Sequence, residues 1–236
     1  ETTLASPLES MELLDAYRLV IIGRDAGVYL TESGIENLRK WISQSGGCLL
    51  CARGAPTEQV PSKLAEILPV RWSPGEESRV RAKVTQHGMD SAVFDPLMAA
   101  GSDPLGALPS LAIGSTPKQR EGLPQVLMQS AGNDGDSNVP VVTYQPFGSG
   151  QTIVVEGAGM WRWAFLSPEH SAKDKIYPTL WQSLVQWIIS QQDMMPGQEV
   201  AIRSDRAAFL SGDRATASVL LRDPAKWKTE SGADAL

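Results

Sequence analysis

The sequence reads LVIIGRDAGVYLTESGIENLRKWISQSGGCLLCA over residues 19–52, and this run has the pattern of a strand, a helix and a second strand. Two continuous apolar segments, 19–22 and 48–52, are typical of strands buried on both faces of a sheet. Between them Thr31 provides an N-cap, and apolar residues recur at helical spacing over 35–42 until two glycines end the pattern. A helix that joins neighbouring strands makes them parallel, so the run predicts a βαβ unit and an α/β fold.

The rest of the chain predicts further strands and a covering helix. Residues 140–145 and 151–156 form a hairpin pattern, so we expect a mixed, mostly parallel sheet flanked by helices. Residues 88–121 are rich in Gly, Pro, Ser and Asp, which predicts an irregular excursion. Residues 177–191 carry large apolar side chains on one helical face, and this helix closes an α/β domain over residues 1–195.

Beyond this domain the apolar period changes to two. Residues 200–202 and 215–221 alternate, and the segment 196–236 is similar to the start of an Ig-like β-sandwich. Two strands alone are marginal in water. They are therefore expected to continue into strands outside this chain; packing on the first domain or pairing with another chain are the alternatives.

Composition excludes several classes of protein. With 21 Lys and Arg against 27 Asp and Glu, and no basic run, no nucleic-acid partner is expected. The apolar runs are far shorter than the roughly 20 residues that cross a bilayer. Two cysteines and two histidines make neither a disulfide framework nor a His-based metal site, and no cofactor is expected. The chain starts at Glu1 without a signal peptide, so we expect a piece of a longer protein.

Further motifs follow the βαβ unit in a recognisable order. LAEILPV stands at 64–70, YQPFGSGQ at 144–151 and WRW at 161–163. In this order, residues 8–192 resemble the class I glutamine amidotransferase-like domain of large bacterial envelope proteins. The resemblance implies a flavodoxin-like sheet in a membrane-anchored protein, with this part on the extracytoplasmic (periplasmic) side. It also implies that the partners are other domains of the parent protein or another protein.

Active relatives of that family use a Cys-His-Glu triad with the cysteine on a strand-to-helix elbow. Cys51 ends the second predicted strand, while Glu169 and His170 follow the last core strand. The residues around Cys51 are not the small ones that such an elbow needs, and the histidine follows the Pro-Glu pair instead of preceding it. We therefore interpret Cys51 as a buried structural thiol. Catalysis by Cys51 is the alternative, with His170 or His87 as the base and Glu169 or Glu156 orienting it.

Cys48 and Cys51 also form a C-x-x-C pattern. Inside a strand, residues three apart point to opposite faces. The pattern therefore predicts two core residues instead of a disulfide or a shared metal site.

Charged residues follow three predicted strands at the same edge of the sheet. Arg24 and Asp25 follow the first strand, Arg53 the second, and Glu156 ends the hairpin. Ligands of open α/β sheets bind outside the carboxyl ends of the strands, and arginine recognises carboxylates and phosphates. We predict that these residues and Arg162 line a ligand crevice. The alternative is that the arginines pair with Asp25 and Glu156 and only hold the loops.

Tryptophans offer a second kind of binding surface. Trp161, with Trp163 and Trp72, is a candidate platform for a sugar ring or a peptide, although core packing is favoured for the WRW motif.

The sequence therefore favours a non-catalytic, amidotransferase-like module that binds or assembles with other parts of an envelope protein. The alternatives are a cysteine-dependent amidotransferase or hydrolase that uses Cys51, and a carbohydrate-binding or sugar-processing module.

Overall fold

Residues 19–52 form the predicted βαβ unit. Strands β1 (Leu19–Ile22) and β2 (Cys48–Ala52) pair in parallel, and helix α2 (Glu32–Ser43) connects them. The Thr31 hydroxyl caps α2 by accepting a hydrogen bond from the Gly34 N–H at 3.1 Å. Gly47 follows the helix and lies against its tryptophan, since a Cβ at this position would be 2.3 Å from the Trp41 ring. The short return from helix to strand therefore requires glycine.

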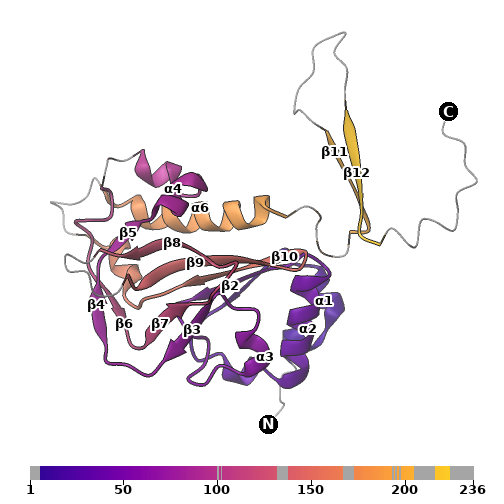
Figure 1. The fold of residues 1–236 in the computed structure, drawn as a ribbon, viewed down its shortest axis with the longest axis horizontal. Coiled ribbons are helices and arrows are strands. Elements are labelled where there is room, and N and C mark those ends of the chain that lie inside the picture. Colours follow the sequence, from indigo (N-terminus) through magenta and orange to yellow (C-terminus); the bar gives the residue numbers. More distant parts are fainter. Residues whose placement is uncertain are drawn as a thin grey trace, which may run out of the picture.

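The structure is a computed structural model, which describes residues 6–99, 101, 103–131, 138–166, 173–192, 194, 196, 198–204 and 216–223. Within these ranges six strands form the main sheet in the order β1-β2-β10-β9-β8-β5 (Figure 1). The strands beyond the βαβ unit are β5 (Ala82–Val84), β8 (Gln125–Ser130), β9 (Pro140–Phe147) and β10 (Gly150–Val155).

The sheet is mixed, as predicted, but parallel pairing does not dominate it. β1, β2 and β10 are mutually parallel, whereas the β10–β9, β9–β8 and β8–β5 pairs are antiparallel. The expectation of a mostly parallel sheet is therefore wrong. The physical reason is that the tight β9–β10 turn forces antiparallel pairing, and β8 and β5 extend the sheet from β9 in the same manner.

Helices cover both faces of the sheet (Figure 1). Helix α6 (Ile176–Ser190) packs on one face, and α1 (Met11–Asp15), α2 and α3 (Ser62–Ala65) lie on the other, next to the 3-10 turn η1 (Pro7–Glu9). Cys48 and Leu50 of β2 belong to the core beneath α6, whereas Leu49 and Cys51 belong to the core beneath α2. The prediction that the two cysteines point to opposite faces is confirmed.

The segment expected to be irregular, 88–121, contributes one strand to each of two short ladders, whose other strands precede it. β3 (Val70–Ser73) pairs with β7 (Thr116–Gln119), and β4 (Ser78–Val80) pairs with β6 (Leu111–Ile113). The helices between them are α4 (Gln86–Asp90) and α5 (Asp95–Met98). Each ladder is only three or four residues long and joins segments far apart in the chain, so the local sequence pattern does not reveal it.

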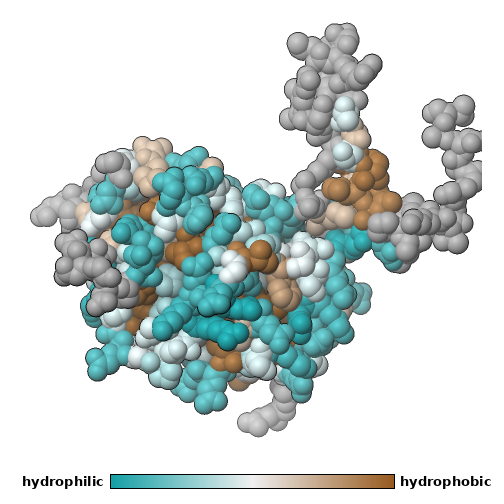
Figure 2. Space-filling model, viewed as in Figure 1, coloured by the Kyte–Doolittle hydropathy of each residue, from teal (hydrophilic) through white to brown (hydrophobic). Residues whose placement is uncertain are grey.

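The last described strands, β11 (Val200–Ser204) and β12 (Ala217–Leu221), form the expected two-stranded antiparallel ladder. Figure 2 shows an apolar surface on it, and Ile202 and Val219 are 72% and 60% exposed. The Ig-like character and the domain boundary stay predictions. In the described part of the chain, every helix is too short or too polar to cross a bilayer.

Candidate functional site: a crevice at the carboxyl ends of the parallel strands

The carboxyl ends of β1, β2 and β10 meet at one edge of the sheet. The strand register sets Ile22 beside Cys51 and Ala52 beside Val155, so the residues after these positions leave the sheet together. Arg24 and Asp25, Arg53, and Glu156 line a single cavity of about 320 Å³. Four of the five residues predicted for the crevice are thus brought together.

The opposite wall comes from the short ladders. Trp72 and Ser73 of β3, and Ile113 and Ser115 from the region where β6 leads into β7, line the same cavity. A β-bridge between Ala112 and Ala158 connects this wall to the chain that follows β10. The sequence suggested Trp72 as part of an aromatic platform. The sequence contained no signal for Ser73 or Ser115, because this wall of the crevice depends on pairing between distant segments.

Glu156 is the buried polar group of the crevice. It is 2% exposed, and the Trp72 indole Nε1–H donates a hydrogen bond to its Oε1 at 2.6 Å. Burial raises the pKa of Glu156 to about 7, although the Trp72 hydrogen bond and the positive charge of Arg24 act in the opposite direction. At neutral pH this carboxyl group is therefore about half protonated.

Two charged residues at the crevice have strained backbones. Asp25 and Arg53 have φ of 60° and 71°, a left-handed conformation that residues with a side chain seldom adopt. Gly54 follows with φ of 88°, and its N–H donates to the Val155 carbonyl at 2.9 Å. A nucleophile elbow turns directly from a strand into a helix, whereas here the next helix, α3, begins only at Ser62. The turn after β2 is therefore not such an elbow, and its strained residue, Arg53, carries a guanidinium that is not a nucleophile.

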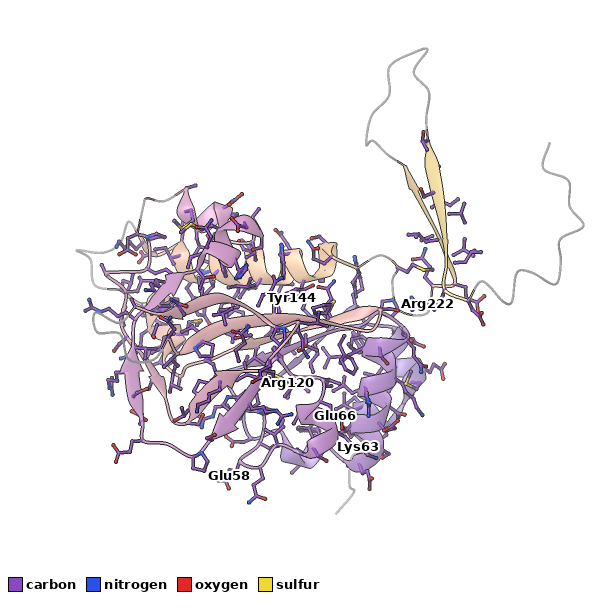
Figure 3. All side chains as sticks on the ribbon, in the orientation of Figure 1. Glu58, Lys63, Glu66, Arg120, Tyr144 and Arg222 are labelled. Atoms are coloured by element: carbon purple, nitrogen blue, oxygen red, sulfur yellow. The ribbon has the colours of Figure 1, made fainter. Side chains whose placement is uncertain are left out.

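Neither arginine forms an ion pair within 4.0 Å of a carboxylate among the described residues, although the charge of Arg24 acts on Glu156. Both arginines are exposed, and the ion pairs in this part of the chain join Arg39 to Glu66 and Lys63 to Glu32 and Glu36, on α2, α3 and the turn after α3. In Figure 3 the side chains of Lys63 and Glu66 lie at a different place from Glu58, which lines the crevice. Direct ion pairs from these arginines to Asp25 or Glu156, which the alternative of a loop-holding network requires, are therefore not observed in the described part of the chain.

Cys51 lies outside the crevice lining. Its side chain is fully buried in the core beneath α2, and burial together with the charge of Glu156 raises its pKa to about 12. His87 lies on α4, which packs against β8, three strands away from β2 in the sheet. Glu169 and His170 lie outside the described residues. A histidine base beside Cys51 is thus not found in the described part of the chain.

Arg162 does not belong to the crevice, and its predicted place there is corrected; Trp161, a candidate for the aromatic platform, lies outside the crevice as well. Both lie on the 3-10 turn η3 (Met160–Ala164) and line a different cavity of about 520 Å³. Arg162 Nε donates to the Gly159 carbonyl at 3.2 Å, and Nη2 donates to the Ser110 carbonyl. Left-handed glycines at 157 and 159 redirect the chain after β10, so the motif leaves the sheet edge. Trp163 is buried, as core packing predicts.

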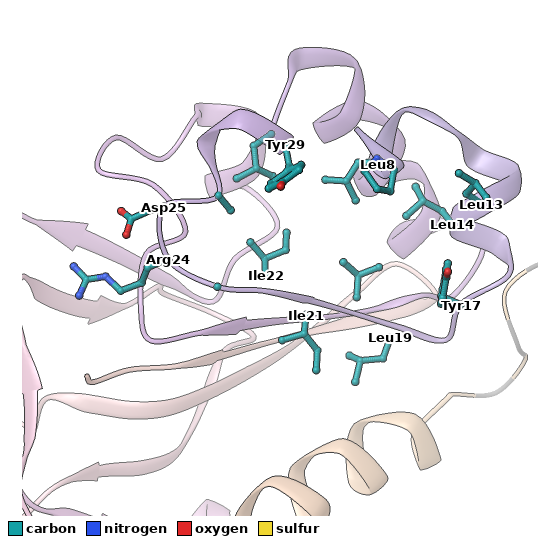
Figure 4. Close-up of a pocket in the computed structure, with 15 residues that line it drawn as sticks. Leu8, Leu13, Leu14, Tyr17, Leu19, Ile21, Ile22, Arg24, Asp25 and Tyr29 are labelled. Carbon is teal, nitrogen blue, oxygen red and sulfur yellow. The ribbon is translucent and has the colours of Figure 1, made fainter. Parts of the chain in front are cut away.

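A third cavity, of about 520 Å³, runs along β1 and shares Arg24 and Asp25 with the crevice (Figure 4). Its lining is mostly apolar, and Tyr17 and Ile21 in it are 58% and 55% exposed. The run 19–22 was expected to be buried on both faces. Ile21 departs from this expectation because β1 is the edge strand of the sheet.

Comparisons with known proteins add information on the fold. No protein-family model matches the chain, and no curated protein matches its sequence. The cytoplasmic protein STM3548 from Salmonella typhimurium is 18% identical with a TM-score of 0.54, and the match covers 76% of this chain and 75% of that one. The cytoplasmic protein STM1381 from Salmonella typhimurium LT2 is 15% identical with a TM-score of 0.50, with the same coverage.

A β-galactosidase from Bacillus circulans sp. alkalophilus is more distant, with 15% identity and a TM-score of 0.43 over 80% of this chain and 25% of the enzyme. At these identities the two Salmonella proteins show a shared α/β fold alone. Both are named as cytoplasmic proteins, which contradicts the extracytoplasmic location expected from the family resemblance, and that expectation is withdrawn.

Proposed function

We propose that this chain is a non-catalytic, amidotransferase-like α/β module that binds a small ligand in the crevice at the carboxyl ends of β1, β2 and β10. The observation that carries the proposal is that Arg24, Asp25 and Arg53, at the ends of β1 and β2, line one cavity, whereas the thiol of Cys51 is buried outside it. A guanidinium binds ligands but does not attack them. The strand ends at this edge are thus suited to recognition of a ligand.

Two features support a ligand site at this edge. A volume of about 320 Å³ falls at the small end of the range of ligand sites, which is roughly 300–1,000 Å³. Strained side-chain-bearing residues cost about 1–3 kcal/mol each and cluster at functional sites, and here Asp25 and Arg53 both line the cavity. Strained residues are not needed merely to end three strands. The strain therefore supports a functional role for the crevice.

The flavodoxin-like and amidotransferase-like character is part of the same proposal. It is supported by the order of the sequence motifs and by the three parallel strands β1, β2 and β10 with helices on both faces. In this proposal the antiparallel strands β9, β8 and β5 extend the sheet beyond the three parallel strands.

Cysteine-dependent hydrolysis is the disfavoured alternative. A thiol attacks as the thiolate, and burial of Cys51 keeps it protonated at physiological pH. Cys51 also packs against the α2 core, where a substrate has no room.

The proposal is tested by alkylation of the native chain with iodoacetamide between pH 6 and 9, with each modified cysteine located by mass spectrometry, together with an assay of glutamine hydrolysis. Cys48, buried on the other face, serves as the internal control. We expect both thiols to react only as fast as the protein unfolds, and no glutamate to be released. Rapid modification of Cys51 that titrates below the free value of about 8.5, together with glutamate release, would overturn the proposal.

A further inference from the structure

Resting on the proposed function, we propose that the crevice ligand is a small organic anion, a carboxylate or a phosphate monoester. Its charge lies between the Arg24 and Arg53 guanidinium groups, and the protonated Glu156 carboxyl group donates a hydrogen bond to it. Binding then requires the protonated form of Glu156. At neutral and alkaline pH the protein therefore takes up a proton when the ligand binds.

The two arginines provide the attraction. They come from different strand ends, they line the same cavity, and the ion pairs of the described residues leave both guanidinium groups available. Guanidinium groups present several N–H donors in a fixed plane that matches the oxygens of carboxylates and phosphates. Two such groups at one small cavity favour an anion over a neutral or cationic ligand.

Glu156 determines in which protonation state the anion is accepted. Its Oε1 accepts the Trp72 N–H, so Oε2 remains to carry a proton toward a ligand. Oε2 packs close to the Gly54 backbone, and a side chain at that position would displace it, because a Cβ there would lie 2.6 Å from that oxygen. An ionised Glu156 would repel an anionic ligand, whereas a protonated one donates to it.

The ionisable groups around Glu156 influence how readily it keeps its proton. The ionisable groups that face the crevice or Glu156 from the neighbouring elements are Arg24 and Asp25 after β1, Cys51 in β2, and Arg53 and Glu58 after β2. The wall from β3 and the β6–β7 connection contributes Trp72, Ser73 and Ser115, which carry no charge. With Glu156 protonated, the lining holds two arginines against the two exposed carboxylates of Asp25 and Glu58, so an anion is selected by the N–H and O–H donors that face it and not by net charge. Burial raises the pKa of Glu156 to about 7.

The test is a titration of the full chain with three probes: inorganic phosphate, D-glucuronate and uncharged D-glucose. Binding is followed by the ¹H–¹⁵N signal of the Trp72 indole, assigned with Trp72→Phe, and by calorimetry. We expect phosphate or glucuronate to shift this signal and glucose to leave it unchanged. Arg24→Gln and Arg53→Gln should each weaken binding at least tenfold. The matched control is Arg79→Gln on β4, an exposed arginine outside the crevice, which should bind as the original chain does.

The protonation step is tested with glucuronate, whose carboxylate stays charged from pH 6 to 9. The affinity should fall about tenfold per pH unit above pH 7. Glu156→Gln keeps an oxygen for Trp72 and an N–H donor for the ligand, so it should bind with little dependence on pH.

Several results would overturn the inference. Equal shifts with glucose and glucuronate would refute an anion site while leaving a ligand crevice, and hence the proposed function, intact. Equal weakening by Arg79→Gln would show attraction by net charge alone. No shift with either anion would refute the ligand class, and an affinity of the original chain that does not depend on pH would refute the role of Glu156.

Discussion

Replacing Glu156 by glutamine should remove a pH-dependent loss of stability from the folded protein. Burial raises the pKa of Glu156 from 4.5 to about 7 in the folded state. Below pH 4.5 both the folded and unfolded states hold the proton, and this group does not change stability. Between pH 4.5 and 7 the unfolded chain releases the proton while the folded chain retains it, so the free energy of unfolding falls by about 1.36 kcal/mol per pH unit. The total loss is about 3 kcal/mol and stays constant above pH 7.

The measurement is a set of urea melts of the original chain and Glu156→Gln at pH 4.5, 5.5, 6.5 and 7.5. Other carboxylates titrate over the same range, so the informative quantity is the difference in unfolding free energy between the two proteins. This difference should move by about 3 kcal/mol in favour of the glutamine variant as the pH rises. Glu77→Gln, which removes an exposed carboxylate between β3 and β4, is the matched control.

A difference between Glu156→Gln and the original chain that does not change with pH would refute the reasoning. It would mean that Glu156 ionises with an ordinary pKa, and the carboxyl group would then be solvated in the crevice instead of buried beside Trp72. A change in the opposite direction would mean that the arginines outweigh the burial.

Three further substitutions test the architecture by the same melts. Gly54→Ala should destabilise by about 2 kcal/mol or more, because it combines a φ of 88° with a contact to Glu156, and smaller losses would refute the close approach. Ile21→Thr, 55% exposed, should cost under about 1 kcal/mol, whereas Ile22→Thr, 7% exposed, should cost at least about 2 kcal/mol; equal costs would contradict the edge position. Trp187→Ala should cost about 3 kcal/mol, because the ring contacts Tyr144 at a centroid distance of 4.9 Å, and a cost below about 1 kcal/mol would refute the packing of α6.

The features that the sequence predicted correctly depend on local periodicity and on topological rules. A helix between two apolar runs implies parallel strands, and parallel strands end at one edge of the sheet. This was enough to group Arg24, Arg53 and Glu156. The alternation of a strand was likewise enough to separate Cys48 from Cys51.

The remaining features depend on distant pairing or on backbone conformations that no periodicity encodes. Trp72 reaches the crevice because β3 pairs with a strand that begins more than forty residues later, at Thr116. Arg162 leaves the crevice because two left-handed glycines turn the chain after β10. Ile21 is exposed because the order of strands, which local hydrophobicity does not determine, makes β1 an edge.

The most direct test of the ligand crevice is ¹H–¹⁵N chemical-shift mapping of the full chain against a panel of small anionic, neutral and cationic metabolites. The account predicts that the amides at 24–25, 53–58, 72–73, 112–115 and 156–157 shift together and saturate with one ligand. Shifts concentrated along β1 around Tyr17 and Ile21, or around Trp161 and Arg162, would place the binding site in another cavity and contradict the account. A crevice that remains unshifted by every class of ligand would contradict it as well.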